Sequence, residues 1–82
     1  MTSLPVALTI AGTDPSGGAG IRADLKSFQA RDVYGMAVIT SVVAQNTRGV
    51  QLIEHVSSEM LKAQLESVFS DILPQAVKTG ML

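Results

Sequence analysis

A glycine-rich loop between an apolar run and an amphipathic stretch is the feature that most constrains how this chain can fold. Gly12–Gly20 contains four glycines in nine residues. The apolar run before it, Val6–Ala11, is typical of a strand buried on both faces. After the loop, apolar side chains recur with helical spacing, which predicts an amphipathic helix over residues 20–31. A strand, a glycine turn and a helix in this order indicate one β–α unit of a parallel sheet.

The rest of the chain continues the alternation of strands and helices. The expected elements are a turn bracketed by Asp32 and Gly35, a strand over Met36–Ala44 buried on both faces, a turn at Asn46–Gly49, a short strand over Val50–Val56, a helix that Ser57 caps and Pro74 ends, and a strand over Ala76–Leu82. This order predicts an α/β fold with an open parallel sheet covered by helices. Because ligands of such folds bind beyond the carboxyl ends of the strands, we expect chemistry after Ala11, after Ala44 and around Gly80.

Size and composition allow one small domain and give it little means of stabilising itself. With 82 residues, the chain buries only about 60–65% of the surface that its unfolded form exposes. It has no cysteine and one histidine, which argues against a disulfide framework and a thiolate metal site. Yet 46% of its residues are apolar and only 16% are charged, against about 25% charged in typical globular domains. We therefore expect residues 1–82 to form a single incomplete domain with the composition of a larger protein's interior.

The charge of the chain argues against polyanionic partners. Its net charge is −1 with an isoelectric point near 5.6, and its six basic residues are scattered along the sequence. No apolar run approaches the roughly 20 residues of a membrane span, and the N-terminus lacks the basic segment of a secretory signal. These features predict a cytoplasmic protein that binds neither nucleic acid nor membranes.

The glycine-rich loop matches two known ligand motifs only in part. Gly12 and Gly17 have the glycine spacing of a phosphate loop. The next residues, Gly18 and Ala19, replace the lysine and the hydroxyl that contact phosphate and magnesium, so this interpretation fails. Residues 18–23 match the G-x-G-x-x-A pattern, but no acidic residue ends the next strand, which disfavours a dinucleotide site. The loop is either a tight turn or a site for another ligand, and its glycines and backbone amides favour the ligand site.

Two polar side chains stand where such a ligand would bind. Asp24 borders the apolar face of the first helix, and it is either a carboxylate stabilised by the helix dipole or a hydrogen-bond acceptor aimed at the site. Gln45 follows a long apolar strand, and its amide is either an ordinary strand-ending group or a partner for the ring nitrogen and amine of a heterocycle. Asp14 precedes Pro15 and is interpreted first as a turn former.

Three further residues are interpreted mainly as structural. Lys78 interrupts an apolar strand near its end, so we expect it to be paired or to extend its ammonium group to solvent rather than to contact phosphate. His55 has no identified partner acid or nucleophile and is expected at the surface. Met81 is expected in the core or in the wall of a pocket.

Three blocks of the sequence resemble a known enzyme family. The blocks are ALTIAGTDPSGGAGIRADLKSF, YGMAVITSVVAQNTRGVQ and VKTGML, which begin at Ala7, Tyr34 and Val77. In order and spacing they resemble the N-terminal third of the hydroxymethylpyrimidine/phosphomethylpyrimidine kinases of thiamine biosynthesis. The resemblance covers residues 7–82 and is more specific than either glycine motif.

This resemblance implies a fold, an activity and a set of site residues. The implied fold is the N-terminal part of a ribokinase-like three-layer α/β/α fold with a mostly parallel sheet. The implied activity uses ATP and Mg²⁺ to phosphorylate 4-amino-5-hydroxymethyl-2-methylpyrimidine and then its monophosphate. The implied pyrimidine contacts are Gly12 and Ala19 through their backbone, Asp24 and Gln45 by hydrogen bonds, and Val43 and Met81 as apolar walls.

The resemblance also leaves alternatives open. Pyridoxal kinases share the N-terminal loop but typically carry another residue at the position of Gln45, so the pyrimidine is favoured and pyridoxal or pyridoxine is the alternative. The family's general base and most of its ATP site lie in a glycine-rich motif near the C-terminus of the whole enzyme. This sequence contains no such motif, so we expect residues 1–82 to carry no catalytic residue, to bind neither ATP nor Mg²⁺ tightly and to be inactive alone. Other possibilities are a non-catalytic pyrimidine-binding module and a segment that forms homodimers or self-associates through its sheet edge.

Overall fold

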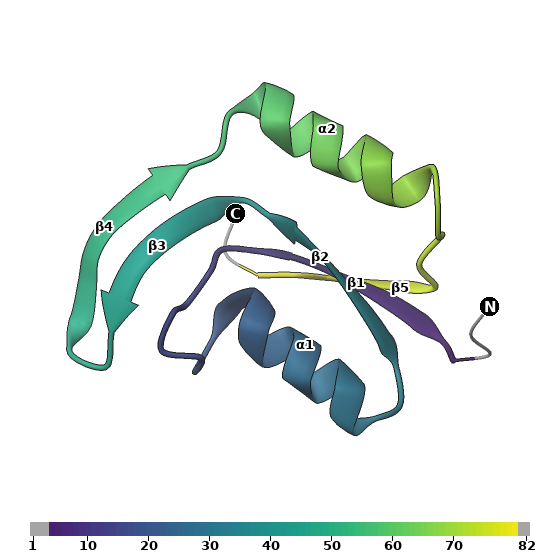
Figure 1. Ribbon diagram of the computed structural model, residues 1–82, viewed down its shortest axis with the longest axis horizontal. Helices are drawn as coiled ribbons and strands as arrows, with labels where there is room; N and C mark the ends of the chain where they lie inside the picture. Colours follow the sequence, from purple (N-terminus) through teal and green to yellow (C-terminus); the bar gives the residue numbers. More distant parts are fainter. Residues whose placement is uncertain (1–3, 81–82) are drawn as a thin grey trace.

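The chain forms a parallel sheet with a helix on each face and a two-stranded ribbon that extends from it (Figure 1). The computed structural model describes residues 4–80. In chain order the elements are β1 (Val6–Ala11), α1 (Gly20–Ala30), β2 (Tyr34–Ile39), β3 (Ser41–Asn46), β4 (Gly49–His55), α2 (Ser58–Phe69) and β5 (Ala76–Thr79). The sheet has the order β2-β1-β5 with all strands parallel, whereas β3 and β4 form a separate antiparallel pair. The predicted α/β class with a parallel sheet is therefore confirmed.

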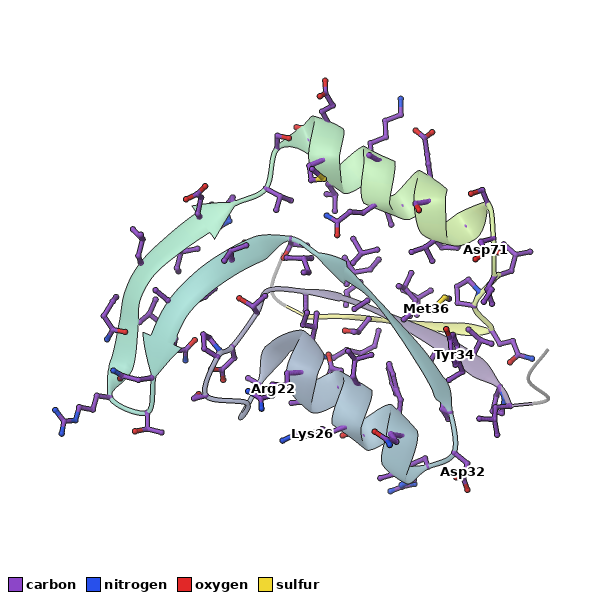
Figure 2. All side chains as sticks on the ribbon, in the orientation of Figure 1. Arg22, Lys26, Asp32, Tyr34, Met36 and Asp71 are labelled. Carbon is purple, nitrogen blue, oxygen red and sulfur yellow. The ribbon has the colours of Figure 1, made fainter. Side chains whose placement is uncertain are left out.

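β1 is the centre of the sheet and is almost wholly buried, as its apolar run predicts. Leu8 and Thr9 have no exposed surface, and neither has Val38 of the neighbouring β2. Figure 1 shows α1 and α2 on opposite sides of the sheet, which makes three α/β/α layers. Arg22 and Lys26 of α1 point away from the sheet, as expected for the polar face of an amphipathic helix (Figure 2).

The apolar stretch Met36–Ala44 is not one buried strand, contrary to the sequence prediction, but parts of two strands in different sheets. The chain turns at Thr40, whose N–H donates to the Ala11 carbonyl at 3.0 Å. Beyond this point β3 pairs with β4 and leaves the helix-covered layer, so Ser41 is buried while Val42 is 56% exposed. Apolar composition predicted burial on both faces, but it carries no information about where a strand changes its partner.

The turn before β2 is shorter than predicted. Asp32 marks its tightest point with a φ of +56°, but Gly35 lies inside β2 rather than in the turn. A Cβ at Gly35 would come within 2.8 Å of Leu25 and 3.0 Å of Phe28. Gly35 therefore allows α1 to pack closely against β2, and its role is in packing rather than in the turn.

α2 begins as predicted and ends earlier than predicted. The Ser57 hydroxyl accepts a hydrogen bond from a backbone N–H of the first turn at 3.0 Å, which confirms the predicted cap. The helix ends at Phe69, before Pro74 is reached. The Gln64 amide accepts from the Ile39 N–H at 2.9 Å and donates to the Ile39 carbonyl at 2.8 Å. The Gln64 side chain thereby bonds both backbone groups of Ile39 at the end of β2, which is an edge strand of the sheet formed by the described residues.

Candidate substrate-binding site

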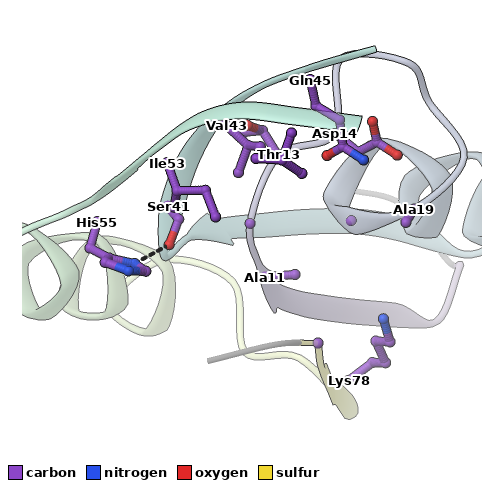
Figure 3. Close-up of a pocket in the computed structure, with 14 residues that line it drawn as sticks. Ala11, Thr13, Asp14, Ala19, Ser41, Val43, Gln45, Ile53, His55 and Lys78 are labelled. Atoms are coloured by element: carbon purple, nitrogen blue, oxygen red, sulfur yellow. Dashed lines mark hydrogen bonds between the residues drawn. The ribbon is translucent and has the colours of Figure 1, made fainter. Parts of the chain in front are cut away.

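A cavity of about 620 Å³ lies where the glycine-rich loop and the β3–β4 ribbon meet the carboxyl ends of β1 and β5 (Figure 3). These are the strand ends at which the sequence predicts a ligand site. The lining residues are Ala11, Gly12, Thr13, Asp14, Ala19, Gly20, Ser41, Val43, Gln45, Val50, Ile53, His55, Lys78 and Gly80. The volume and the mixture of apolar walls with a few polar groups suit a small organic molecule.

The loop is shaped by its own backbone. Gly20 begins α1 with a φ of +68°, and the Ile21 N–H donates to the Gly12 carbonyl at 3.1 Å. This bond joins the first turn of α1 to the end of β1. A Cβ at Gly20 would overlap the carbonyl oxygen of Gly12, so the two segments can approach only because position 20 has no side chain.

Asp14 stabilises the loop, as its interpretation as a turn former predicts. Its Oδ1 accepts hydrogen bonds from the N–H and the hydroxyl of Ser16. The Ser16 hydroxyl has the largest effect and lowers the pKa of Asp14; desolvation opposes this, and bonds from the loop backbone add to it. Asp14 therefore remains ionised at neutral pH, and its carboxylate accepts hydrogen bonds from the loop itself.

The ribbon is tied to the loop by Thr13. The Thr13 N–H donates to the Ser41 carbonyl at 3.0 Å, and the Thr13 hydroxyl accepts from the Val43 N–H at 2.9 Å. Because side chains alternate along a strand, this attachment leaves Val43 and Gln45 on the cavity side, where both are half-buried. Two residues that the sequence placed in a pocket thus lie next to the loop.

Of the six predicted contacts, four line the cavity: Gly12, Ala19, Val43 and Gln45. Asp24 is not a lining residue, and it lies beyond the first turn of α1, so the helix-dipole interpretation is wrong. Its Oδ2 accepts hydrogen bonds from Thr9 Oγ1 at 2.7 Å and from Lys78 Nζ at 2.9 Å. The predicted pairing of Lys78 is confirmed by this ion pair. Met81 lies outside the described residues.

Ser41 and His55 form a hydrogen-bonded pair in the cavity wall that was not predicted from the sequence. His55 is exposed as predicted, but it has a partner, because its Nδ1 lies 2.7 Å from Ser41 Oγ and the two groups share a hydrogen bond. The antiparallel register places these residues directly opposite each other. A regular hairpin closed by the predicted turn at residues 46–49 would pair Ser41 with Glu54. The register shift between Ala44 and Gln45 moves the partner to His55, so the turn alone could not have revealed the pair.

Two observations bear on the nucleotide and the metal that the resemblance implies for a whole enzyme. Within residues 4–80, no group of three His, Cys, Asp or Glu side chains is arranged to hold a metal ion. The loop also carries Gly18 and Ala19 where a phosphate loop needs lysine and a hydroxyl. In the same part of the chain, no helix has the length and apolar character needed to span a membrane.

The family model of phosphomethylpyrimidine kinase matches residues 14–82. The chain belongs to this family. Hydroxymethylpyrimidine/phosphomethylpyrimidine kinases of Staphylococcus aureus and Escherichia coli are each 62% identical to it, over 94% and 93% of its length. The chain spans only 28% and 29% of these two proteins. The resemblance stated from the sequence blocks is therefore confirmed.

Solved structures of the family and of related kinases share the fold. The phosphomethylpyrimidine kinase of Clostridium difficile matches with a TM-score of 0.92 and 56% identity, over 95% of this chain and 34% of that chain. A pyridoxal kinase of Staphylococcus aureus in complex with AMP-PCP matches with a TM-score of 0.87 and 43% identity, over 99% and 30%. The described residues therefore form part of a ribokinase-like α/β fold, and the relatives are phosphotransferases.

Proposed function

We propose that this chain forms part of the pyrimidine pocket of a hydroxymethylpyrimidine/phosphomethylpyrimidine kinase, which phosphorylates 4-amino-5-hydroxymethyl-2-methylpyrimidine and its monophosphate with ATP and Mg²⁺. One observation carries the proposal. The identity of 62% to such kinases extends over a region whose cavity is lined by four of the six expected contacts. The proposed occupant is the pyrimidine, and the nucleotide would be bound by other parts of a whole enzyme.

The chemistry of the lining supports a flat, uncharged heterocycle. Val43 and Ile53 supply apolar walls, and the Gln45 amide offers donors and an acceptor to a ring nitrogen and an exocyclic amine. A Cβ at Gly12 would fill space beside Ser41 and Val43, so glycine there keeps the cavity open for close approach of a ring.

The charged side chains of the lining are already paired within the protein. Asp14 is bonded to Ser16, and Lys78 is bonded to Asp24. A charged group placed in this cavity would therefore have to compete with these partners, whereas the neutral pyrimidine ring needs only hydrogen bonds. The arrangement favours recognition by shape and by Gln45 over recognition by charge.

Calorimetric titration of the 82-residue chain with the pyrimidine alcohol tests the proposal. We expect binding, and we expect Gln45→Ala to weaken it about tenfold, because a buried polar group of the ligand loses its partner. Gln51→Ala is the matched control: Gln51 is exposed on the adjacent β4, does not line the cavity, and its variant should bind as the unaltered chain does. Equal weakening in both variants, or none in Gln45→Ala, would contradict the assignment.

Pyridoxal is the second candidate ligand, since pyridoxal kinases of Bacillus subtilis and Staphylococcus aureus match at 46% and 43% identity. Two of the matched Staphylococcus aureus pyridoxal kinase structures contain pyridoxal. Pyridoxal kinases typically carry another residue at the position of Gln45, so the glutamine in this chain supports the pyrimidine instead. Pyridoxal binding as tight as pyrimidine binding in the same titration would overturn the preference.

We further infer that these 82 residues are one incomplete domain of a cytoplasmic enzyme and do not phosphorylate the pyrimidine by themselves. The absence of a glycine-rich general-base motif from the sequence supports this inference. Self-association is supported by the apolar side chains on the ribbon, among which Leu52 is 65% exposed. Clear ADP formation by the isolated chain with the pyrimidine alcohol, ATP and Mg²⁺ would contradict the inferred inactivity.

A further inference from the structure

Asp24 is held by two residues that the register of the sheet brings together. Thr9 of β1 and Lys78 of β5 are direct partners in the parallel pairing. Partners of this kind project from the same face of a sheet, and here both side chains reach Asp24 of α1. Thr9 Oγ1 donates to Asp24 Oδ2 at 2.7 Å, and Lys78 Nζ donates to the same atom at 2.9 Å.

The two bonds occupy only one of the two oxygens of the Asp24 carboxylate. Both donors bind Oδ2, and Oδ1 has no hydrogen-bond partner among the described residues. An ionised carboxylate can accept at both oxygens. The free Oδ1 is therefore able to accept a hydrogen bond from a group outside this network.

The network stands at the wall of the cavity. Lys78 lines the cavity, with its side chain 50% exposed, and Figure 3 shows it reaching up from β5. Its Nζ lies 3.7 Å from the point where a Cβ of Gly80, another lining residue, would sit. Asp24, at 18% exposure, is one hydrogen bond behind this wall.

We propose that Thr9 and Lys78 are positioning residues, which hold Asp24 by Oδ2 so that Oδ1 accepts a hydrogen bond from an N–H or O–H donor of a small heterocycle in the cavity. This inference rests on the proposed function, and it deepens it by naming two residues that act through Asp24. Thr9 is fully buried, so it fixes the carboxylate from the core side. Lys78 fixes it from the cavity side.

The same two residues keep Asp24 ionised. Burial is the largest influence on Asp24 and raises its pKa, but hydrogen bonds from Thr9 and Lys78 and the charge of Lys78 together outweigh it. The net result is a pKa below the ordinary value for an aspartate. β1 contributes only the neutral Thr9, so the charged group that acts on Asp24 is Lys78 of β5.

Two readouts on one set of variants test the positioning role. The variants are Lys78→Met, Lys78→Arg, Thr9→Val and, as a control on the exposed side of α2, Lys62→Met. The first readout is the pKa of Asp24, followed by NMR of its carboxyl carbon without ligand. The second is the dissociation constant of the pyrimidine alcohol, measured by calorimetry across a pH series.

We expect Lys78→Met to raise the pKa of Asp24, to weaken pyrimidine binding about tenfold and to shift the acid limit of binding to higher pH. Thr9→Val, which keeps the shape of the buried side chain, should act in the same direction. Lys78→Arg should keep the pKa of Asp24 and the dissociation constant near those of the unaltered chain, because guanidinium also donates to a carboxylate. Lys62→Met should change neither.

The outcomes separate this inference from the function on which it rests. If the unaltered chain does not bind the pyrimidine, the proposed function is overturned, and the ligand-binding role of Asp24 falls with it. If the unaltered chain binds and both Lys78→Met and Thr9→Val bind equally well, only the positioning role is overturned. An unchanged pKa of Asp24 in Lys78→Met also overturns it, since the ion pair would then not act on the carboxylate.

Discussion

Replacing Gly20 by alanine tests whether the backbone of the glycine-rich loop, rather than its side chains, builds the site. Gly20 has a φ of +68°, where an L side chain costs about 1–2 kcal/mol. Its Cβ would overlap the Gly12 carbonyl oxygen and come within 3.2 Å of the Asp14 nitrogen. The Gly12 carbonyl is not free to move away, because it accepts the Ile21 N–H at 3.1 Å.

The size of the effect follows from these contacts. Displacing the Gly12 carbonyl costs the hydrogen bond to Ile21, about 0.5–1.5 kcal/mol, in addition to the cost of the left-handed backbone. The lower unfolded-state entropy of alanine offsets about 0.4–1 kcal/mol. We therefore expect Gly20→Ala to lower the free energy of unfolding by about 2 kcal/mol and to weaken pyrimidine binding.

Gly17→Ala is the matched control, measured in the same urea titration followed by far-UV circular dichroism. Gly17 also has a positive φ, +81°, but a Cβ there would meet only the flexible Arg22 side chain at 3.7 Å or more. Its substitution should therefore lower the free energy of unfolding by only about 1 kcal/mol or less. Equal destabilisation by the two variants would refute the reasoning, because the overlap with Gly12 would then contribute nothing.

Two further predictions concern stability. Leu8→Ala removes a fully buried side chain from β1 and should lower the free energy of unfolding by about 2–5 kcal/mol. The control, Leu52→Ala on the exposed ribbon, should change the free energy of unfolding by no more than about 0.5 kcal/mol. Similar losses in the two variants would mean that β1 is not the core. The pKa values of Asp14 and Asp24 are lowered in the folded chain. The stability that these carboxylates contribute is therefore present above their ordinary pKa of about 4 and is lost as the pH falls through the lowered values. Urea titrations from about pH 7 to about pH 3 should show this loss, and the free energy of unfolding should depend less steeply on pH in Asp14→Asn. An unchanged pH dependence in that variant would contradict the role assigned to Asp14.

The elements that the sequence predicts well are those whose signals are local. β1 matches its apolar run, and α1 matches its helical spacing. The Ser57 hydroxyl caps α2 by accepting the Met60 N–H, three residues further along the chain. Met36–Ala44 was predicted wrongly, because the change from one sheet to another at Thr40 depends on hydrogen bonds to Ala11 and to β4 that lie far away in the sequence.

The candidate site divides in the same way. The strand-end rule and the glycine-rich loop point to the cavity, and Gly12 and Gln45 line it. The pair of Ser41 and His55 depends on the register of a hairpin.

The sequence by itself determines that a strand, a glycine turn and a helix follow one another, and its blocks identify the kinase family, because backbone preferences and motif spacing are properties of neighbouring residues. Only the tertiary structure decides that Thr9, Lys78 and Asp24 meet. These residues come from β1, β5 and α1, and the parallel register alone places Thr9 beside Lys78. A hydrogen bond forms over about 3 Å, so which side chains share a site is decided by how distant segments pack.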